Sequence, residues 1–268
     1  MRAIRLFCEN LEPGTRTLSD EESRHVRNAL RLAAGAHVTL FDGAGQVVEA
    51  TLDEVTRHHV RIRVDSAATR VAAGVGQSLT LAVAFPKSSR QSFMVEKVTE
   101  LGVGTVIPLV CARSVVIPQK SVTARCRRWA MEAAKQAHRA WLPAFKPPVP
   151  FVRFIKEHAA AHDVPASGKR AQLLADLGDW PSLVERFILG QAEEPGNELE
   201  TARRSNLPDS AIVCIGPEGG WTDEERSLAR DAGWCSVSLG EHVLRTETAA
   251  VAAAAQWGGL FPTDRSSR

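Results

Sequence analysis

The spacing of apolar residues changes near residue 75 and divides the chain into two differently patterned parts. Between Val38 and Val64 apolar and polar residues alternate, most clearly where Val60, Ile62 and Val64 are separated by arginines. An alternation of period two is typical of strands with one buried face. This part of the chain is therefore predicted to be a small β-rich domain, either a barrel or a sheet.

The segment Thr69 to Gln77 is the best candidate for a linker. It contains Gly74 and Gly76 among small residues. Glycine-rich sequence without a clear pattern is typical of segments that few contacts cross. We place the domain boundary here, with residues 1–73 in the first domain and residues 74–268 in the second.

In the second part, apolar runs typical of strands alternate with amphipathic segments typical of helices. The predicted strands cover residues 79–85, 105–110, 172–175, 211–216 and 236–240, and the predicted helices cover residues 89–101, 121 onward, 222–233 and 249–257. The run that begins at Ala211 is apolar throughout, which suits a strand buried on both faces. The order of elements predicts an α/β domain.

The predicted helix that begins at Ser121 carries basic residues opposite its apolar side. At the helical period, Arg128, Lys135 and Arg139 fall on one face. Residues 111–146 contain eight Lys and Arg residues and a single acid, Glu132. Such a concentration of positive charge is typical of proteins that bind phosphates. The alternative is an ordinary solvated surface.

Two strand-to-helix junctions near the C-terminus contain the candidate chemistry. The loop Gly216 to Gly220 follows a buried strand, at the edge where open α/β sheets bind ligands, and its glycines allow a ligand to approach the backbone. Thr222 and Glu225 form the pattern of a capping box, which predicts that a helix begins directly after this loop. A tight structural turn is the alternative interpretation.

The second junction, Leu239 to Thr248, leaves another strand and enters the last helix. Its last five residues, Leu244 to Thr248, contain an arginine, an acid and two hydroxyls, and two such junctions suggest one pocket. Arg245 and Glu247 could instead form a salt bridge that caps the helix. His242 is as well explained as a surface residue, and Glu218 as an acid that the helix dipole favours.

Composition excludes several classes of protein. The formal net charge is +2, and the five cysteines are scattered without a CxxC pair, so neither a disulfide framework nor a metal site is predicted. The apolar patch at the start of the chain is broken by Arg2, Arg5 and Glu9 and is too short for a signal peptide or a membrane span. We expect a cytoplasmic protein that does not enter a membrane.

Three motifs together resemble one family. GPEGG (Gly216 to Gly220), LGxxxLRTETA (Leu239 to Ala249) and EKVTELGV (Glu96 to Val103) occur in the order found in the RsmE family of small-subunit (16S) ribosomal RNA uridine-N3 methyltransferases. Outside residues 159–206 the resemblance extends over nearly the whole chain. Lys135 and His138 depart from the family pattern, which has an acid and a small residue at these positions.

The resemblance implies a PUA-like RNA-binding domain followed by a SPOUT methyltransferase domain with a deep trefoil knot, which is a rare exception to unknotted topology. It also implies a homodimer that binds S-adenosylmethionine, ribosomal RNA as the partner, and no metal. The expected cofactor-binding residues are Leu174, Ile215, Gly216, Pro217, Glu218, Gly219, Leu239, Gly240, Val243, Leu244, Arg245, Thr246 and Thr248.

The reaction needs alignment of the two reactants and removal of one proton from the imide nitrogen. Arg245 is expected to stabilise the negative charge that develops on the uracil carbonyls. Glu247 and Glu218 are both candidates for the base, and solvent is a third. The RNA backbone is expected to contact Arg113, Arg128, Lys135 and Arg139.

Two other functions fit part of this pattern. A related SPOUT methyltransferase acting on transfer RNA shares the cofactor chemistry. A non-catalytic RNA-binding or ribosome-assembly factor needs only the PUA-like domain and the basic helix. The presence of both glycine loops favours an enzyme over such a factor.

Overall fold

The computed structural model describes residues 4–159, 170–175, 208–240 and 242–259. The chain forms two compact units. The first unit contains Met1–Ala73 together with Ala130–Leu142, and the second contains Gly74–Trp129 and Pro143–Arg268. The alternation between Val38 and Val64 and the α/β order that follows it therefore correspond to two separately packed bodies.

The first unit is built on a mixed sheet. Its strands are β1 (Arg5–Phe7), β2 (Gly14–Thr17), β3 (His37–Phe41), β4 (Gln46–Val55), β5 (Val60–Val64) and β6 (Thr69–Arg70). They pair in the order β1-β3-β4-β5-β2, and β6 pairs with β4. The helices α1 (Asp20–Arg24) and η1 (His25–Leu30) connect β2 to β3.

The period-two alternation read in this region is confirmed. Val60, Ile62 and Val64 are buried, and they pack with Leu40 and Leu52 in one hydrophobic core. Thr69 and Arg70 belong to a strand, and η2 (Val75–Ser78) is a short 3-10 helix. The segment expected to be an irregular linker therefore begins and ends in regular structure.

The segment Ala130–Leu142 contributes Trp141 to the first unit. A Cβ atom on Gly45 would lie 2.3 Å from the Trp141 ring, so only glycine leaves room for the indole. The indole nitrogen donates a hydrogen bond to the carbonyl oxygen of Val71 (3.1 Å), and Arg70 lies over the ring at 5.0 Å. This packing explains why these residues belong to the first unit although they follow the start of the second.

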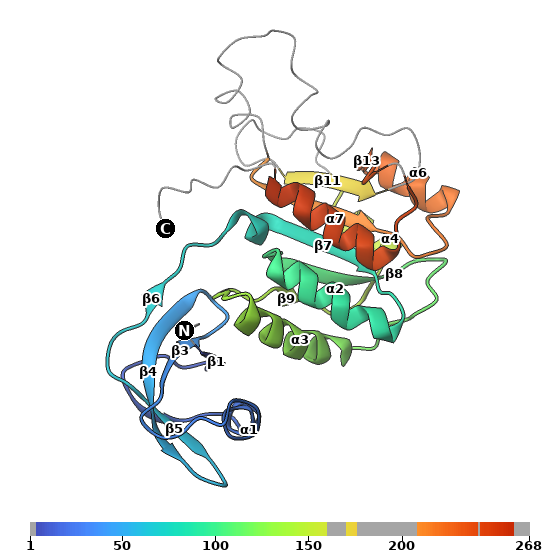
Figure 1. Ribbon diagram of the computed structural model, residues 1–268. Coiled ribbons are helices and arrows are strands. Elements are labelled where there is room, and N and C mark those ends of the chain that lie inside the picture. Colours follow the sequence, from blue (N-terminus) through green and yellow to red (C-terminus); the bar gives the residue numbers. More distant parts are fainter. Residues whose placement is uncertain (1–3, 160–169, 176–207, 241, 260–268) are drawn as a thin grey trace, which may run out of the picture. The chain divides into compact units, whose positions relative to one another are not determined.

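The second unit is an α/β domain, as predicted, and its sheet is parallel (Figure 1). Its strands are β7 (Leu79–Ala84), β8 (Thr105–Val110), β9 (Ala144–Phe145), β10 (Val149–Pro150), β11 (Arg170–Ala175), β12 (Ser210–Ile215) and β13 (Cys235–Val237). The order is β10-β8-β7-β12-β11-β13, and β9 pairs with β8. The central strands β7 and β12 are buried almost throughout, which agrees with their continuous apolar runs.

Helices cover both faces of this sheet. They are α2 (Ser88–Glu100), α3 (Val122–Gln136), α4 (Phe151–Glu157), α6 (Asp223–Asp231) and α7 (Thr246–Gly259). Helices α2 and α7 pack against each other on one face (Figure 1). On the other face, α4 and α6 pack against the sheet in a core that contains Phe151, Phe154, Trp221 and Trp234. The sequence did not predict α4, which begins directly after Pro150.

Candidate functional site

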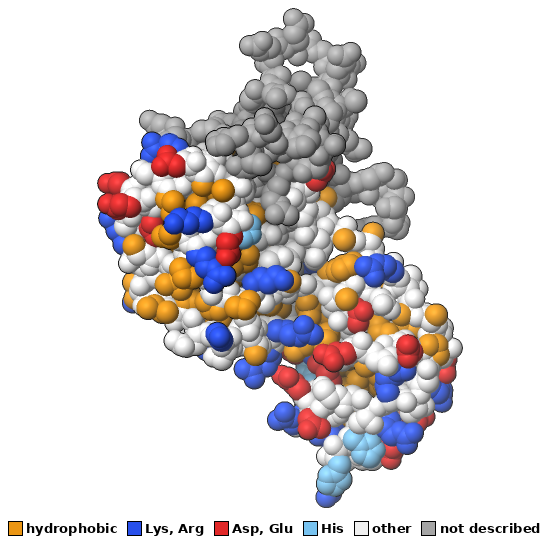
Figure 2. Space-filling model, turned by 180° about the vertical axis from the view of Figure 1, so that it is seen from behind, with side chains coloured by type: hydrophobic (Ala, Val, Ile, Leu, Met, Phe, Trp, Pro, Cys, Tyr) orange, Lys and Arg blue, Asp and Glu red, His pale blue; other side chains and the backbone are white. Residues whose placement is uncertain are grey.

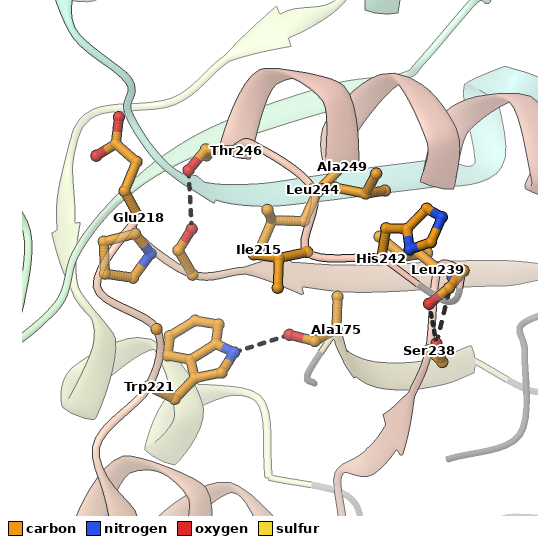
Figure 3. A pocket seen from close by; sticks show the side chains of 15 residues that line it. Ala175, Ile215, Glu218, Trp221, Ser238, Leu239, His242, Leu244, Thr246 and Ala249 are labelled. Carbon is orange, nitrogen blue, oxygen red and sulfur yellow. Dashed lines mark hydrogen bonds between the residues drawn. The ribbon is translucent and has the colours of Figure 1, made fainter. Parts of the chain in front are cut away.

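A pocket lies at the carboxyl ends of strands β11, β12 and β13. It is lined by Ala175, Ile215, Gly216, Pro217, Glu218, Gly220, Trp221, Ser238, Leu239, Gly240, His242, Val243, Leu244, Thr246 and Ala249 (Figure 3). The strands are parallel, so their carboxyl ends meet at one edge of the sheet, which is where open α/β sheets form their ligand sites. The two junctions singled out in the sequence therefore build one pocket.

The first loop depends on the absence of side chains. A Cβ atom on Gly216 would lie 2.9 Å from Cε2 of Trp221. Gly220 has a φ of +69°, a conformation that favours glycine, and its amide donates to the carbonyl oxygen of Pro217 at 2.8 Å. The Trp221 indole is fixed by a hydrogen bond of 2.8 Å to the carbonyl oxygen of Ala175 (Figure 3).

A capping box fixes the start of α6 behind this loop. The amide of Glu225 donates to the Thr222 hydroxyl, and the amide of Thr222 donates to the Glu225 carboxylate, as the sequence predicted. The same carboxylate accepts a hydrogen bond of 2.9 Å from the amide of Ala112, just after β8. Glu225 therefore joins the loop after β8 to the loop after β12.

Arg113 strengthens this connection. Its guanidinium donates to the carbonyl oxygen of Gly219 at 2.9 Å and to that of Trp221 at 3.4 Å. The structure therefore places Arg113, an expected RNA contact, on the outer side of the glycine loop. A Cβ atom on Gly219 would point toward this arginine side chain, at 3.2 Å.

The second loop is tied to the first by Thr246. Its hydroxyl donates to the carbonyl oxygen of Gly216 at 3.2 Å (Figure 3). The loop turns at Gly240, where φ is +147°, and the Ser238 hydroxyl bonds both the amide and the carbonyl of Gly240. These contacts hold backbone groups of both loops around the pocket.

Most of the expected cofactor residues line this pocket. The exceptions are Leu174, which is buried in the core of the sheet, and Gly219, Arg245 and Thr248, which are exposed and are not among the lining residues. The sequence did not identify Ala175, Gly220, Trp221, Ser238, His242 and Ala249 as lining residues. Each lies within or directly beside one of the motifs, or next to a residue that was identified, so including the immediate neighbours of the motifs and of the identified residues would have found them.

Glu247 is paired with an arginine that the sequence analysis did not single out. Its side chain is 8% exposed, and its Oε1 lies 3.4 Å from Nε of Arg90, in the first turn of α2. Arg90 also approaches Glu218, with 3.8 Å between Nη1 and Oε1. Arg245 is exposed, and no ion pair joins it to Glu247 within the described part of the chain. The alternative interpretation, in which Arg245 and Glu247 form a salt bridge, is therefore wrong.

The expected basic face of α3 is only partly present. Arg128 is exposed, but Lys135 is buried, with its ammonium between the carboxylates of Glu22 and Glu132. Arg139 follows the end of the helix and is half-buried, and burial lowers the pKa of its guanidinium. Lys135 was expected on the exposed side, and this was wrong because α3 turns that side toward Glu22. On the face seen in Figure 2, basic and acidic side chains are interspersed.

The described residues contain neither a candidate metal site nor a helix that could span a membrane. No group of three or more His, Cys, Asp or Glu side chains there could hold a metal ion. Among the same residues, no helix is long and apolar enough to cross a membrane.

Comparison with known proteins identifies the family. The family model described as an RNA methyltransferase domain matches residues 75–258, and the model of an RNA methyltransferase PUA domain matches residues 18–65. Ribosomal RNA small subunit methyltransferase E of Synechocystis is 31% identical over 94% of this chain and 76% of its own. This chain belongs to the ribosomal RNA small subunit methyltransferase E family. The Bacillus subtilis member is 28% identical, over 89% of this chain and 87% of its own.

Solved structures agree with this membership. A methyltransferase from Legionella pneumophila, in complex with S-adenosylmethionine, has a TM-score of 0.75 and is 27% identical over 97% of this chain and 98% of its own. The family member from Neisseria gonorrhoeae, also bound to S-adenosylmethionine, has a TM-score of 0.74 and is 26% identical over the same shares. The α/β methyltransferase fold with a PUA-like domain is therefore shown for this chain.

Proposed function

We propose that this protein transfers a methyl group from S-adenosylmethionine to N3 of a uridine in the 16S RNA of the small ribosomal subunit. The observation that carries the proposal is the pocket made by the loops after β12 and β13, in a chain of this family. Relatives solved with S-adenosylmethionine support the choice of cofactor. RNA as the substrate is supported by the family and by the names of its curated members.

The pocket residues fit such a cofactor. Gly216, Gly220 and Gly240 leave backbone groups open to a ligand, and Ile215, Leu239 and Leu244 supply apolar surface for a flat aromatic group. We propose that these residues, with Pro217, Val243 and Thr246, hold S-adenosylmethionine, while Gly219, Arg245 and Thr248 border the site. When bound, the cofactor supplies an electrophilic methyl group on a positively charged sulfur atom.

The chain itself must orient the uracil and accept one proton. Arg245, exposed on the second loop, is proposed to stabilise negative charge on the uracil carbonyls. Glu247 and Glu218 are the candidate proton acceptors, and both lie next to Arg90. Arg128, Arg113 and Arg139 are proposed to contact RNA phosphates. Buried Lys135 is proposed to act indirectly, by fixing the end of α3 through its ion pairs.

The proposal includes a wider architecture. Residues 1–73 are proposed as the PUA-like RNA-binding domain and residues 74–268 as the SPOUT methyltransferase domain, with a trefoil knot around the cofactor loops. A homodimer in the cytoplasm is proposed as the working form. The family membership supports each of these points.

Two measurements test the function. Calorimetric titration with S-adenosylmethionine should show binding, whereas a purely RNA-binding assembly factor should show none. Small ribosomal subunits from a host strain that lacks the gene should gain one N3-methyluridine per 16S RNA on incubation with the protein and cofactor, located by mass mapping. Methyl incorporation into transfer RNA instead would favour the related activity and contradict the proposed substrate.

A further inference from the structure

Arg90 connects an acid in the loop after β12 to an acid in the first turn of α7. It lies in the first turn of α2, directly after the loop that follows β7. Its Nε is 3.4 Å from Oε1 of Glu247 and its Nη1 is 3.8 Å from Oε1 of Glu218. Helix α2, the loop after β12 and helix α7 therefore meet through one guanidinium, whose planar array of donors suits two carboxylates at once.

The two acids differ in their surroundings. The Glu218 side chain is 33% exposed, whereas that of Glu247 is 8% exposed. Water can replace Arg90 as a partner of Glu218, but it has little access to Glu247. The guanidinium is therefore most important to Glu247, because a buried carboxylate without an opposite charge is strongly disfavoured.

Only one carboxylate oxygen of Glu247 has a partner among the described residues. Oε1 faces Arg90, but Oε2 is buried and has no hydrogen-bond partner among the residues that the structure describes. A buried polar atom without a partner needs an explanation, such as a bound water or a catalytic role, and Glu247 is the only acidic residue with such an atom among those described. Glu247 neighbours Thr246, which lines the pocket. Glu247 itself is not among the residues that line the pocket, so a substrate group must reach this buried oxygen from the edge of the pocket.

Arg90 is itself held in place by the first turn of α2. Its amide donates to the carbonyl oxygen of Lys87 at 2.9 Å. The neighbouring Gln91 is buried, donates to the carbonyl oxygen of Pro86 at 2.8 Å and accepts from Arg125 of α3 at 3.0 Å. The backbone that carries Arg90 is therefore fixed on both sides, and its guanidinium reaches Glu218 and Glu247 from this fixed point.

We infer that Arg90 is a positioning residue that holds Glu247 as an anion, with one oxygen paired and the other directed at the substrate as the proton acceptor. This inference rests on the proposed methyl transfer. In the step, the uracil N3–H bond breaks, the proton goes to Oε2 of Glu247, and the electron pair stays on N3. That pair then forms the N–CH3 bond as the S–CH3 bond breaks, and the bonding electrons go to sulfur.

The other charged groups around Glu247 are few. Helix α7 packs against α2, β7, β12 and η2, and the last three contain no Asp, Glu, Lys, Arg or His. Helix α2 contributes Arg90, and its other charged residues, Glu96, Lys97 and Glu100, lie further along the helix. The loop before α7 contributes His242 and Arg245, both exposed, and Glu218 lies on the far side of Arg90. Among the described residues, Arg90 is therefore the basic side chain that forms an ion pair with Glu247.

A double-mutant cycle tests the inference. The variants are Arg90→Gln, Glu247→Gln, the double variant and Arg90→Lys, with Arg153→Gln as the matched control because Arg153 is exposed and pairs with Glu157 on α4. Single-turnover methylation of unmethylated small ribosomal subunits is measured at saturating cofactor across pH. Calorimetry gives the affinity for S-adenosylmethionine.

Each single variant should lose rate on the order of 10²-fold near neutral pH. The double variant should be no slower than Glu247→Gln, because Arg90 acts through Glu247. The deficit should shrink as pH rises and the uracil ionises unaided. Arg90→Lys should recover part of the rate, cofactor affinity should stay within a few-fold of wild type, and Arg153→Gln should match wild type.

Losses that multiply in the double variant, or a deficit that does not change with pH, would overturn the inference. A wild-type protein that methylates no RNA would instead contradict the proposed function. In that case thermal unfolding still tests the positioning role. Arg90→Gln should unfold a few degrees below the double variant, because it leaves the Glu247 carboxylate buried without its partner. Equal midpoints would count against that role.

Discussion

The indole ring of Trp221 occupies the space that a side chain on Gly216 would need, with 2.9 Å between Cε2 of the ring and the position of such a Cβ atom. The ring is itself fixed by its hydrogen bond to Ala175. The first loop of the pocket therefore keeps its shape because Gly216 has no side chain and the large indole of Trp221 packs against it. This relationship determines which glycine is most sensitive to substitution.

Gly216→Ala should weaken binding of S-adenosylmethionine about tenfold or more, because overpacking a fixed site costs about 1 to 3 kcal/mol. Gly219→Ala is the comparison, since its added Cβ would meet only the exposed side chain of Arg113 and should have a smaller effect. Calorimetric titration of both variants measures the difference. A larger loss for Gly219→Ala would mean that the ligand, and not Trp221, restricts this loop.

Arg128→Ala should reduce the dependence of RNA affinity on salt. If the exposed guanidinium contacts one phosphate, the slope of log K against log salt concentration should fall by about 0.7 to 0.9. Affinity for S-adenosylmethionine should not change. The measurement is filter binding of a ribosomal RNA fragment at several salt concentrations. An unchanged slope would assign Arg128 to an ordinary solvated surface.

Lys135→Met should destabilise the fold, because Glu22 is buried and would lose its opposite charge. Removing one partner of a buried pair costs about 3 to 5 kcal/mol, which denaturant unfolding measures. Lys120→Met, which replaces an exposed lysine, is the control and should be nearly neutral. A neutral effect of Lys135→Met would contradict this expectation, because it would mean that water solvates the Glu22 carboxylate in place of the lysine.

The stability of the wild type should also depend on pH through Lys135. Burial by itself lowers the pKa of its ammonium, but Glu22 and Glu132 outweigh burial and raise that pKa above 10.5. Because the folded-state pKa lies above the unfolded value, the stabilisation is complete below pH 10.5 and is lost as pH rises through the folded-state pKa. The free energy of unfolding should therefore fall more steeply above pH 10.5 in the wild type than in Lys135→Met.

Arg245→Lys should retain the fold and much of the cofactor affinity but lower the single-turnover rate on the order of 10²-fold, because lysine cannot reproduce the planar guanidinium. The exposed position of Arg245 makes a structural effect of this change small. Rapid-quench methylation at saturating cofactor measures the rate. A wild-type rate would leave Arg245 as a residue of the helix start without a part in the chemistry.

The cysteines should differ in their reactivity. Burial, with a contribution from Glu225, raises the pKa of Cys111 to about 12, and burial raises that of Cys126 to about 12. At pH 8 only about one thiol in ten thousand at these positions is ionised. Iodoacetamide followed by peptide mass spectrometry should therefore label half-buried Cys235 well before Cys111 or Cys126. Early labelling of Cys111 would indicate that the core around it opens.

The local parts of this protein could be predicted from the sequence because they depend on local spacing. The alternation at Val60, Ile62 and Val64 gives a half-buried strand, the apolar run at Ala211 gives a central strand, and the capping box at Thr222 gives a helix start. The two glycine-containing junctions were expected to form one pocket because open α/β sheets bind ligands where their strands end.

What the tertiary structure decided is which distant side chains meet. Arg90 contacts Glu247, which lies 157 residues further along the chain, because α2 and α7 pack side by side on the sheet. The sequence around either helix does not specify this pairing. Lys135 faces Glu22 and not solvent because the end of α3 belongs to the first unit. A helical period shows which residues share a face, but only packing determines what that face meets.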